Sequence, residues 1–258
     1  MNKLLKIEYA KVSGYAAFKI LMLGYFLAAA TLFLSLHNFS FGPFQIFGQE
    51  TLKFPYVWQN VAFVGKFLNL GLGIVIILLI GNEFSFGTAK QNLIDGLSRR
   101  QLVISKYLLL LVIALGATVF MFFVALIMGW ANSVTITGDL IFKNVAFMLS
   151  YFLHAFGLMS MAAFIAYLFR KTAIATMFFL AYAVFMEAIL RLSIDADFTR
   201  YFPSKALSNL ISTPYADLVS GMDLQLQNVA WNEYMLPALF YALLFFLLSM
   251  QVVKKRSL

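Results

Sequence analysis

Two apolar runs, residues 61–80 and 102–130, constrain this chain more than any other feature of its sequence. A helix rises about 1.5 Å per residue, so about 20 apolar residues are enough to cross the ~30 Å hydrocarbon layer of a bilayer. The whole chain has the same character, with 62% hydrophobic and 12% charged residues, whereas a soluble domain has about 25% charged residues. The sequence therefore predicts an all-α membrane protein.

The spacing of the apolar runs predicts six spanning helices in a single transmembrane domain over residues 1–258. The predicted spans are residues 20–36, 57–82, 102–130, 141–169, 172–194 and 234–253. Lysines and apolar residues at helical spacing predict an interfacial helix over residues 1–19, with its lysines toward lipid headgroups and solvent. Prolines and half-apolar pieces between the last two spans predict short helices that dip into the outer leaflet.

The distribution of positive charge predicts the orientation. Six spans place both termini on one side of the membrane, and 13 of the 19 basic residues fall on that side. They are Lys3, Lys6, Lys11, Lys19, Lys90, Arg99, Arg100, Lys106, Arg170, Lys171, Lys254, Lys255 and Arg256. Because basic residues are enriched in cytoplasmic loops, both termini are predicted to be cytoplasmic.

Several kinds of chemistry have no signal in this sequence. The chain has no cysteine and two histidines, so we expect no metal site. It lacks the Gly-x-x-x-x-Gly-Lys-Ser/Thr loop that binds nucleotide phosphates, and it has no nucleophile elbow. We therefore expect no enzyme activity and no cofactor in this chain. The net charge of +8 reflects orientation signals, so nucleic acid is not an expected partner.

A polar segment at residues 81–101 separates the two long apolar runs. Thr88 and Gln91, and again Ser98 and Gln101, have the spacing of a capping box, in which each side chain bonds a free backbone amide of the other residue. Gly96 fits a left-handed helix end. The segment therefore predicts a short helix at about residues 89–95 and a new helix from Ser98. The alternative is that its basic residues serve only as ordinary cytoplasmic anchors.

The run NEFSFGTAKQNLIDGLSRRQLVISK, residues 82–106, resembles the cytoplasmic segment between the second and third spans of ABC-2 type transporter permeases. In that family the segment is a coupling helix that docks onto an ABC ATPase subunit, which binds ATP and Mg. The residues that the resemblance implicates in ATPase coupling are Glu83, Gly87, Thr88, Lys90, Asp95, Gly96, Ser98, Arg99, Arg100 and Lys106.

The resemblance implies the permease subunit of an ATP-driven exporter in the bacterial cytoplasmic (inner) membrane. A second copy or a related chain would complete the translocation pathway, with membrane lipid around both. Arg99 and Arg100 would pair with acids of the ATPase or with lipid phosphates, and Glu83 with Arg99 or Lys106. The alternative is a non-transporting membrane scaffold or assembly subunit. The apolar, aromatic-rich spans favour an amphiphilic cargo.

Four residues inside predicted spans are candidates for the pathway. Glu187 and Arg191 lie four positions apart on one helical face and are expected to pair, either for packing or for transport. Lys66 either extends toward the outer interface or binds substrate. A lone histidine such as His154 is more often a hydrogen-bonded structural residue than a proton relay.

Overall fold

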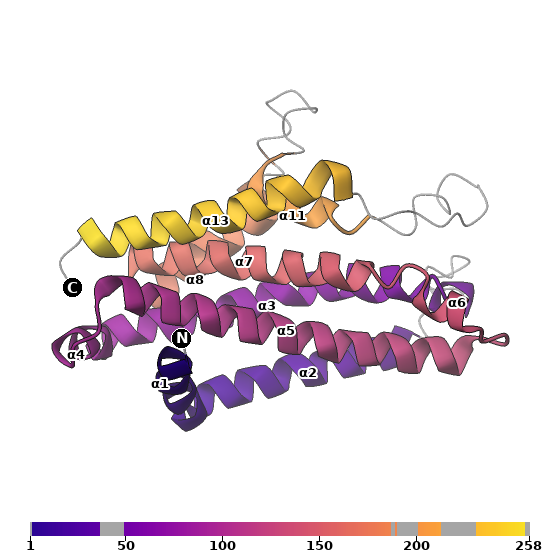
Figure 1. Ribbon diagram of the computed structural model, residues 1–258, viewed down its shortest axis with the longest axis horizontal. Coiled ribbons are helices and arrows are strands. Elements are labelled where there is room, and N and C mark those ends of the chain that lie inside the picture. Colours follow the sequence, from indigo (N-terminus) through magenta and orange to yellow (C-terminus); the bar gives the residue numbers. More distant parts are fainter. Residues whose placement is uncertain (1, 37–48, 187–188, 190–200, 213–230, 256–258) are drawn as a thin grey trace.

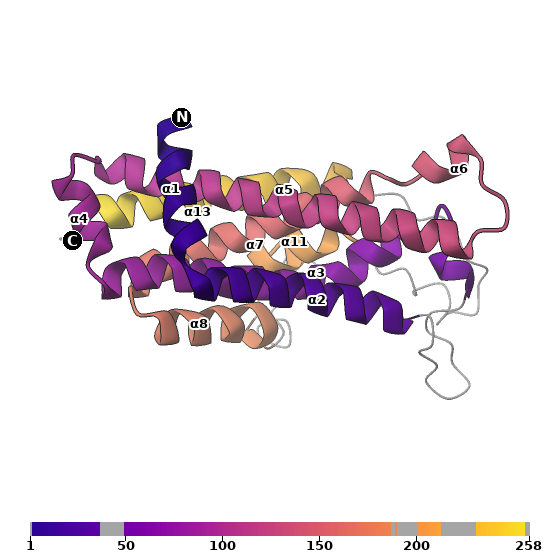
Figure 2. The ribbon, with the colours of Figure 1, turned by 90° about the horizontal axis from the view of Figure 1, so that it is seen from below.

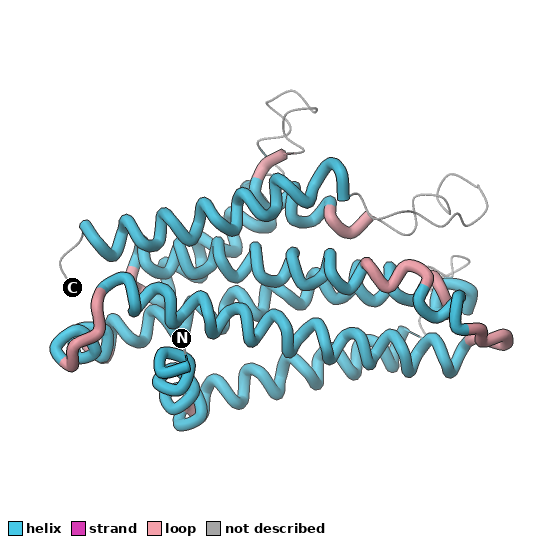
Figure 3. Tube along the Cα trace, in the orientation of Figure 1, coloured by secondary structure: helices cyan, strands magenta, loops and turns pink. Residues whose placement is uncertain are grey.

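A computed structural model of the chain describes residues 2–36, 49–186, 189, 201–212 and 231–255, and all its regular elements in these ranges are helices (Figure 3). The long helices are α2 (Ala16–Leu36), α3 (Val57–Ser85), α5 (Arg99–Asn132), α7 (Phe147–Phe169) and α13 (Trp231–Lys255). The short ones are α1 (Asn2–Gly14), η1 (Gln49–Leu52), α4 (Thr88–Ile94), α6 (Gly138–Phe142), α8 (Thr172–Leu180), the π-helix η2 (Ala181–Met186) and α11 (Pro203–Asn209).

Five helical stretches in the described ranges are long and apolar enough to cross a membrane. They correspond to the predicted first, second, third, fourth and sixth spans. The predicted fifth span, 172–194, is described without a gap only as far as residue 186. Its described apolar helix is therefore shorter than the five that are long enough to cross a membrane. The fold is that of an all-α membrane protein.

The long helices run side by side along one axis, with α3 and α7 at the centre (Figures 1 and 2). α7 packs mainly against α3 and α13, and it is the most buried of the long helices. α2, α5 and α13 are peripheral and expose rows of large apolar side chains, as expected for helices in contact with lipid or another membrane chain.

One end of the bundle differs from the other. α4 lies at this end, and α13 finishes there (Figure 1). α1 crosses the bundle almost at right angles to α2 in the same half of the molecule (Figure 2). α6 lies at the opposite end. α4, the end of α13 and α1 are therefore found in the same half of the bundle.

Two predicted boundaries were wrong for local reasons. The helix predicted over residues 1–19 stops at Gly14, and after a break at Tyr15 the first spanning helix begins at Ala16. The predicted fourth span, 141–169, is divided, because Asn144 adopts a left-handed conformation between α6 and α7. Asparagine tolerates that conformation better than most residues. The second, third and sixth predicted spans differ from α3, α5 and α13 by a few residues at their ends.

The tight turn predicted at Arg170 and Lys171 is present. Arg170 takes the left-handed conformation that ends α7, and α8 begins two residues later. The predicted pair Glu187–Arg191 lies outside the described residues, as does most of the segment predicted to form outer-leaflet helices. Within that segment α11 is described, and it packs against α7 and α13.

Candidate functional site

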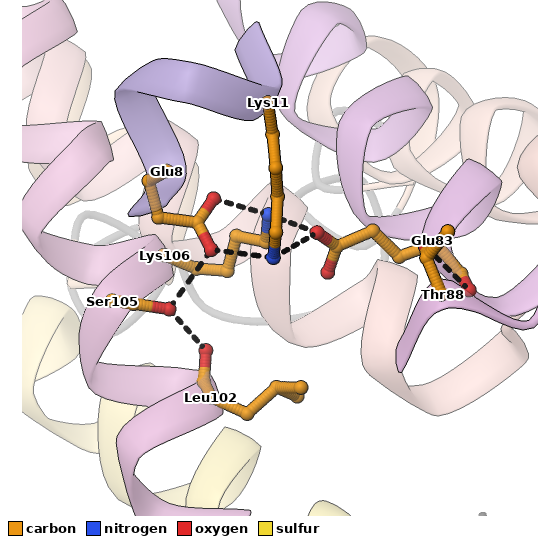
Figure 4. Close-up of polar contacts among 7 residues, drawn as sticks. All are labelled: Glu8, Lys11, Glu83, Thr88, Leu102, Ser105 and Lys106. Carbon is orange, nitrogen blue, oxygen red and sulfur yellow. Dashed lines mark hydrogen bonds and ion pairs between the residues drawn. The ribbon is translucent and has the colours of Figure 1, made fainter. Parts of the chain in front are cut away.

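Four charged side chains meet where α1 and the α4 ends of α3 and α5 converge, and we call them the charge cluster: Glu8, Lys11, Glu83 and Lys106 (Figure 4). Two acids face two lysines, so the formal charges balance. Glu8 and Lys11 come from α1, Glu83 from α3 and Lys106 from α5. Three helices are therefore joined by ion pairs at one point.

The Lys106 ammonium lies at the centre of the cluster. Its Nζ is 2.5 Å from Glu8 Oε2 and 2.7 Å from Glu83 Oε1. Lys11 Nζ bridges the same two acids, at 3.2 Å from Glu8 and 3.1 Å from Glu83. The Ser105 hydroxyl donates to Glu8 Oε1 at 3.1 Å. Every charge thus has at least two polar partners, which is the condition under which buried charges are tolerated.

The centre of the charge cluster is shielded from solvent, whereas the Lys11 side chain is 29% exposed. Glu8 is 1% exposed and Lys106 is 3% exposed. Burial by itself would raise the pKa of Glu8, but the ammonium groups of Lys106 and Lys11 outweigh that effect and hold the pKa of Glu8 below its ordinary value. Glu8 is therefore a carboxylate at neutral pH.

The cluster corrects two expectations about lysines. Lys11 was predicted to point to headgroups or solvent, and it points to Glu8 and Glu83 instead. Lys106 was predicted to project into the cytoplasm with the first turns of its helix, but it is buried. In both cases an acid from a distant part of the sequence supplies the partner. The pairing of Glu83 with Lys106, one of two predicted alternatives, is present.

α4 begins and ends through backbone geometry. Gly87 adopts a left-handed conformation, φ 70°, at the helix start. At the other end the Gly96 amide donates to the Leu93 carbonyl and the Leu97 amide to the Asn92 carbonyl, with Gly96 at φ 94°. This pair of bonds is a Schellman motif, which ends a helix at a left-handed residue. The helix predicted at about 89–95 lies at Thr88–Ile94.

Only one of the two predicted capping boxes forms. The Ser98 hydroxyl accepts from the Gln101 amide, and the Gln101 side chain accepts from the Ser98 amide, so α5 starts as predicted. The box at Thr88 was wrong. Its hydroxyl instead donates to the backbone carbonyl of Glu83 at 3.3 Å, across the turn between α3 and α4. α4 is therefore tied directly to the residue that carries one acid of the charge cluster.

A hydrogen bond and a pocket lie beside α4. Asn82 Nδ2 donates to the hydroxyl of Tyr15, the residue between α1 and α2, at 2.5 Å. A pocket of about 380 Å³ lies between α1, α3 and α4, and both of these residues and Asn92 line it. α4 thus packs directly against α3 and α5, and the pocket lies between it and α1.

The remaining predicted coupling residues separate into two groups. Lys90, Asp95 and Arg100 are exposed. Arg99 points to the end of α13, where its Nη1 donates to the carbonyls of Lys254 at 2.8 Å and Val253 at 3.3 Å. The structure therefore does not contain the second predicted alternative, a pairing of Arg99 with Glu83.

A second polar group lies inside the bundle, away from α4. The hydroxyls of Tyr25 and Tyr151 share a hydrogen bond of 2.5 Å, and Tyr151 donates to Asn69 Oδ1 at 2.8 Å. Asn69 Nδ2 then lies 3.0 Å from His154 Nδ1. His154 is therefore hydrogen-bonded, as expected for a structural histidine. Lys66 was expected to extend toward the interface or to bind substrate, and it is buried.

Comparison with known proteins supports the resemblance drawn from the α4 segment. Residues 4–186 match the sequence family described as "ABC-2 family transporter protein". The match covers more than half of the chain and includes all four residues of the charge cluster. This chain belongs to the ABC-2 transporter family. No curated protein matches it. The family match and the five apolar helices together identify this ABC-2 protein as a multi-pass membrane component of ABC-type transport.

Sequence reasoning missed three residues of this ABC-2 protein's α4 end. Glu8 was passed over because it is one acid among the lysines of an amphipathic helix. Phe86, two positions before α4, and Ile94, the last residue of α4, are 73% and 70% exposed. Their signal was available, since both are large apolar residues inside a polar segment between two spans.

Proposed function

We propose that this chain is the permease subunit of an ATP-driven ABC-2 exporter and that α4 couples it to a separate ATPase subunit. ATP and Mg would bind to that ATPase. Two permease chains would form the translocation pathway in the bacterial cytoplasmic membrane, with both termini in the cytoplasm. The observation that carries the proposal is the link from α4 through Glu83 to α1 and α5.

The link gives α4 a mechanical connection to the spans. α4 follows α3 after a two-residue turn, and Thr88 bonds back to the carbonyl of Glu83. Glu83 in turn bonds Lys106 of α5 and Lys11 of α1. A displacement of α4 by a closing ATPase would therefore act on three helices together. Packed helices respond to such a push by tilting as units.

The docking surface of α4 is proposed to combine apolar and charged contacts. Phe86 and Ile94 offer apolar anchors, and exposed Lys90 and Arg100 offer positive charge beside them. Such a surface would fit a groove on the ATPase that has an apolar floor and an acidic rim. Buried apolar anchors usually carry most of the affinity of an interface, while rim charges mainly affect association and specificity.

The test replaces the anchor at the end of α4. Ile94→Ser should reduce ATPase co-purification with the permease at least tenfold, because loss of a hot-spot side chain costs about 2 kcal/mol or more. The matched control is Val134→Ser, which removes another exposed apolar side chain, at the opposite end of the bundle. Both variants should insert into the membrane in wild-type amounts.

The outcome separates the proposal from the scaffold alternative. Retention of full ATPase binding and cargo-stimulated ATP hydrolysis in Ile94→Ser would remove α4 from the coupling role. Failure of any ABC ATPase to bind the wild-type chain would favour a scaffold. The family match does not favour that alternative, because it identifies a transport component.

A further inference from the structure

A buried tyrosine hydroxyl near the charge cluster has no hydrogen-bond partner among the described residues. It belongs to Tyr167 in the last turn of α7, a residue that is 1% exposed. A buried polar group that makes no hydrogen bond costs free energy, so folded proteins rarely keep one. The Tyr167 hydroxyl is therefore available for a bond that the described arrangement does not make.

The packing of α7 on α3 places Tyr167 near Glu83. The Tyr167 ring packs edge-on against Phe84, the residue that follows Glu83, with 6.1 Å between the ring centroids. The negative charges of Glu83 and Glu8 both act on the Tyr167 hydroxyl. A tyrosine hydroxyl can donate to a carboxylate, and a charged acceptor makes the bond stronger than a neutral one. The two acids of the charge cluster are therefore the candidate acceptors.

Of these two acids, Glu83 has the free oxygen. Glu8 accepts bonds on both of its carboxylate oxygens. Glu83 receives both of its lysines on Oε1, and no described bond involves its Oε2 (Figure 4). The Glu83 side chain is also the more exposed of the two, at 11% against 2% for Glu8. Glu83 can therefore turn toward Tyr167 more easily than Glu8 can.

A turn of Glu83 would leave every charge of the cluster with a partner. Both lysines would keep Glu8, which lies 2.5 Å from one and 3.2 Å from the other. Glu83 would exchange its two ion pairs for one hydrogen bond from Tyr167, so the exchange requires work. Thr88 of α4 offers a route for that work, because its hydroxyl is bonded to the backbone carbonyl of Glu83.

We propose that Tyr167 is the second partner of Glu83, whose carboxylate bonds the lysines of the charge cluster in one state and the Tyr167 hydroxyl in another. Movement of α4, which is tied to Glu83 through Thr88, drives the exchange. The proposal deepens the coupling function: the trigger by α4 rests on that function, whereas the alternative bond does not.

The alternative bond is tested by thermal unfolding of the full-length chain alone, in detergent. Tyr167→Phe removes only the unpaired hydroxyl, so in the wild-type background the unfolding midpoint should fall by less than about 1 °C. Lys11→Met removes one of the two ion pairs of Glu83 and thereby favours the exchange. In that background Tyr167→Phe should lower the midpoint by about 2–4 °C, because a hydroxyl bonded to a carboxylate is then lost.

Tyr107→Phe is the matched control. Tyr107 directly follows Lys106 and is also buried, but its hydroxyl has two partners, the Ser160 carbonyl at 3.3 Å and Ser249 Oγ at 3.1 Å. Its loss should lower the midpoint equally in both backgrounds. A fall for Tyr167→Phe in the wild-type background as large as that for Tyr107→Phe would overturn the proposal, since the Tyr167 hydroxyl would then already be paired. The same small change for Tyr167→Phe in both backgrounds would also overturn it.

The effect on coupling is measured separately, in the complex with the ATPase. Tyr167→Phe should keep wild-type ATPase co-purification and lose about threefold or more of its cargo-stimulated ATP hydrolysis. Tyr107→Phe should keep that rate per folded complex. If Lys11→Met does not fold, this comparison decides the proposal, and equal rates for the two tyrosine variants would overturn it. Failure of every ABC ATPase to bind the wild-type chain would remove the proposed function and leave the unfolding test in force.

Discussion

The charge cluster depends on residues that the sequence separates widely. Glu8 and Lys106 are 98 positions apart, yet their charged atoms lie 2.5 Å from each other. A buried ion pair adds little net stability over an apolar pair of the same size, but removal of one partner is costly, because the other charge stays buried. The cluster therefore acts mainly by fixing how α1, α3 and α5 meet.

Replacement of Glu8 tests that role. Glu8→Gln keeps the size of the side chain but removes one of the two acids that pair with Lys106. Glu83 of α3 then remains as the partner of Lys106. We expect a loss of about 1–3 kcal/mol in unfolding free energy, below the ~3–5 kcal/mol for a buried charge that loses its partner. Thermal unfolding in detergent measures the loss. Asp95→Asn, which changes an exposed acid at the same end, should change stability by less than about 0.5 kcal/mol.

The same residue predicts a dependence on pH. The pKa of Glu8 in the folded protein lies below its ordinary value of 4.5. A carboxylate with a lowered pKa contributes stability above the unfolded pKa, and this contribution is lost as the pH falls through the folded value. Wild-type stability should therefore decline on acidification below about pH 4.5. Thermal unfolding at a series of pH values should give a shallower decline for Glu8→Gln. Identical profiles for the two proteins would show that Glu8 is not held as a charged partner.

Sequence patterns predicted the elements of this molecule better than the contacts between them. The capping box at Ser98 and the helix end at Gly96 involve residues within a few positions of each other, so local sequence determines them. The box at Thr88 failed because Gly87 supplies the helix start and leaves the hydroxyl free to bond the preceding turn. Glu8 could not be recognised as part of the site, because its partners are brought together only by the packing of three helices.

The left-handed end of α4 can be tested at Gly96. A Cβ at this position would meet no atom within 4 Å, so the cost of Gly96→Ala is backbone strain alone. We expect about 1–2 kcal/mol, borne by the turn between α4 and α5. The result should be a normal membrane yield with reduced ATPase-coupled turnover. Gly116→Ala in α5 is the control, since its added Cβ also meets open space and its backbone is helical. Wild-type turnover in Gly96→Ala would mean that the direction of α4 is unimportant.

At the scale of the whole molecule, hydropathy predicted the helical membrane fold, and charge predicts its orientation. The chain contains no cysteine, so single cysteine variants report accessibility directly. In intact cells, a membrane-impermeant thiol reagent should label Asp139→Cys and should leave Lys90→Cys and Lys171→Cys unlabelled. Permeabilised cells provide the control, since all three positions should then react. Labelling of position 90 in sealed cells would reverse the orientation and place α4 on the wrong side for an ATPase.

The most direct test of the account asks which end of the bundle touches the ATPase. A photo-crosslinking amino acid at Lys90 or Ile94 samples the α4 end, and one at Val134 samples an exposed position at the other end. After illumination of membranes that contain both subunits, we expect a permease–ATPase adduct from positions 90 and 94 and none from position 134. Absence of the adduct from both α4 positions, or an equal yield from position 134, would contradict the claim that α4 couples this permease to ATP hydrolysis.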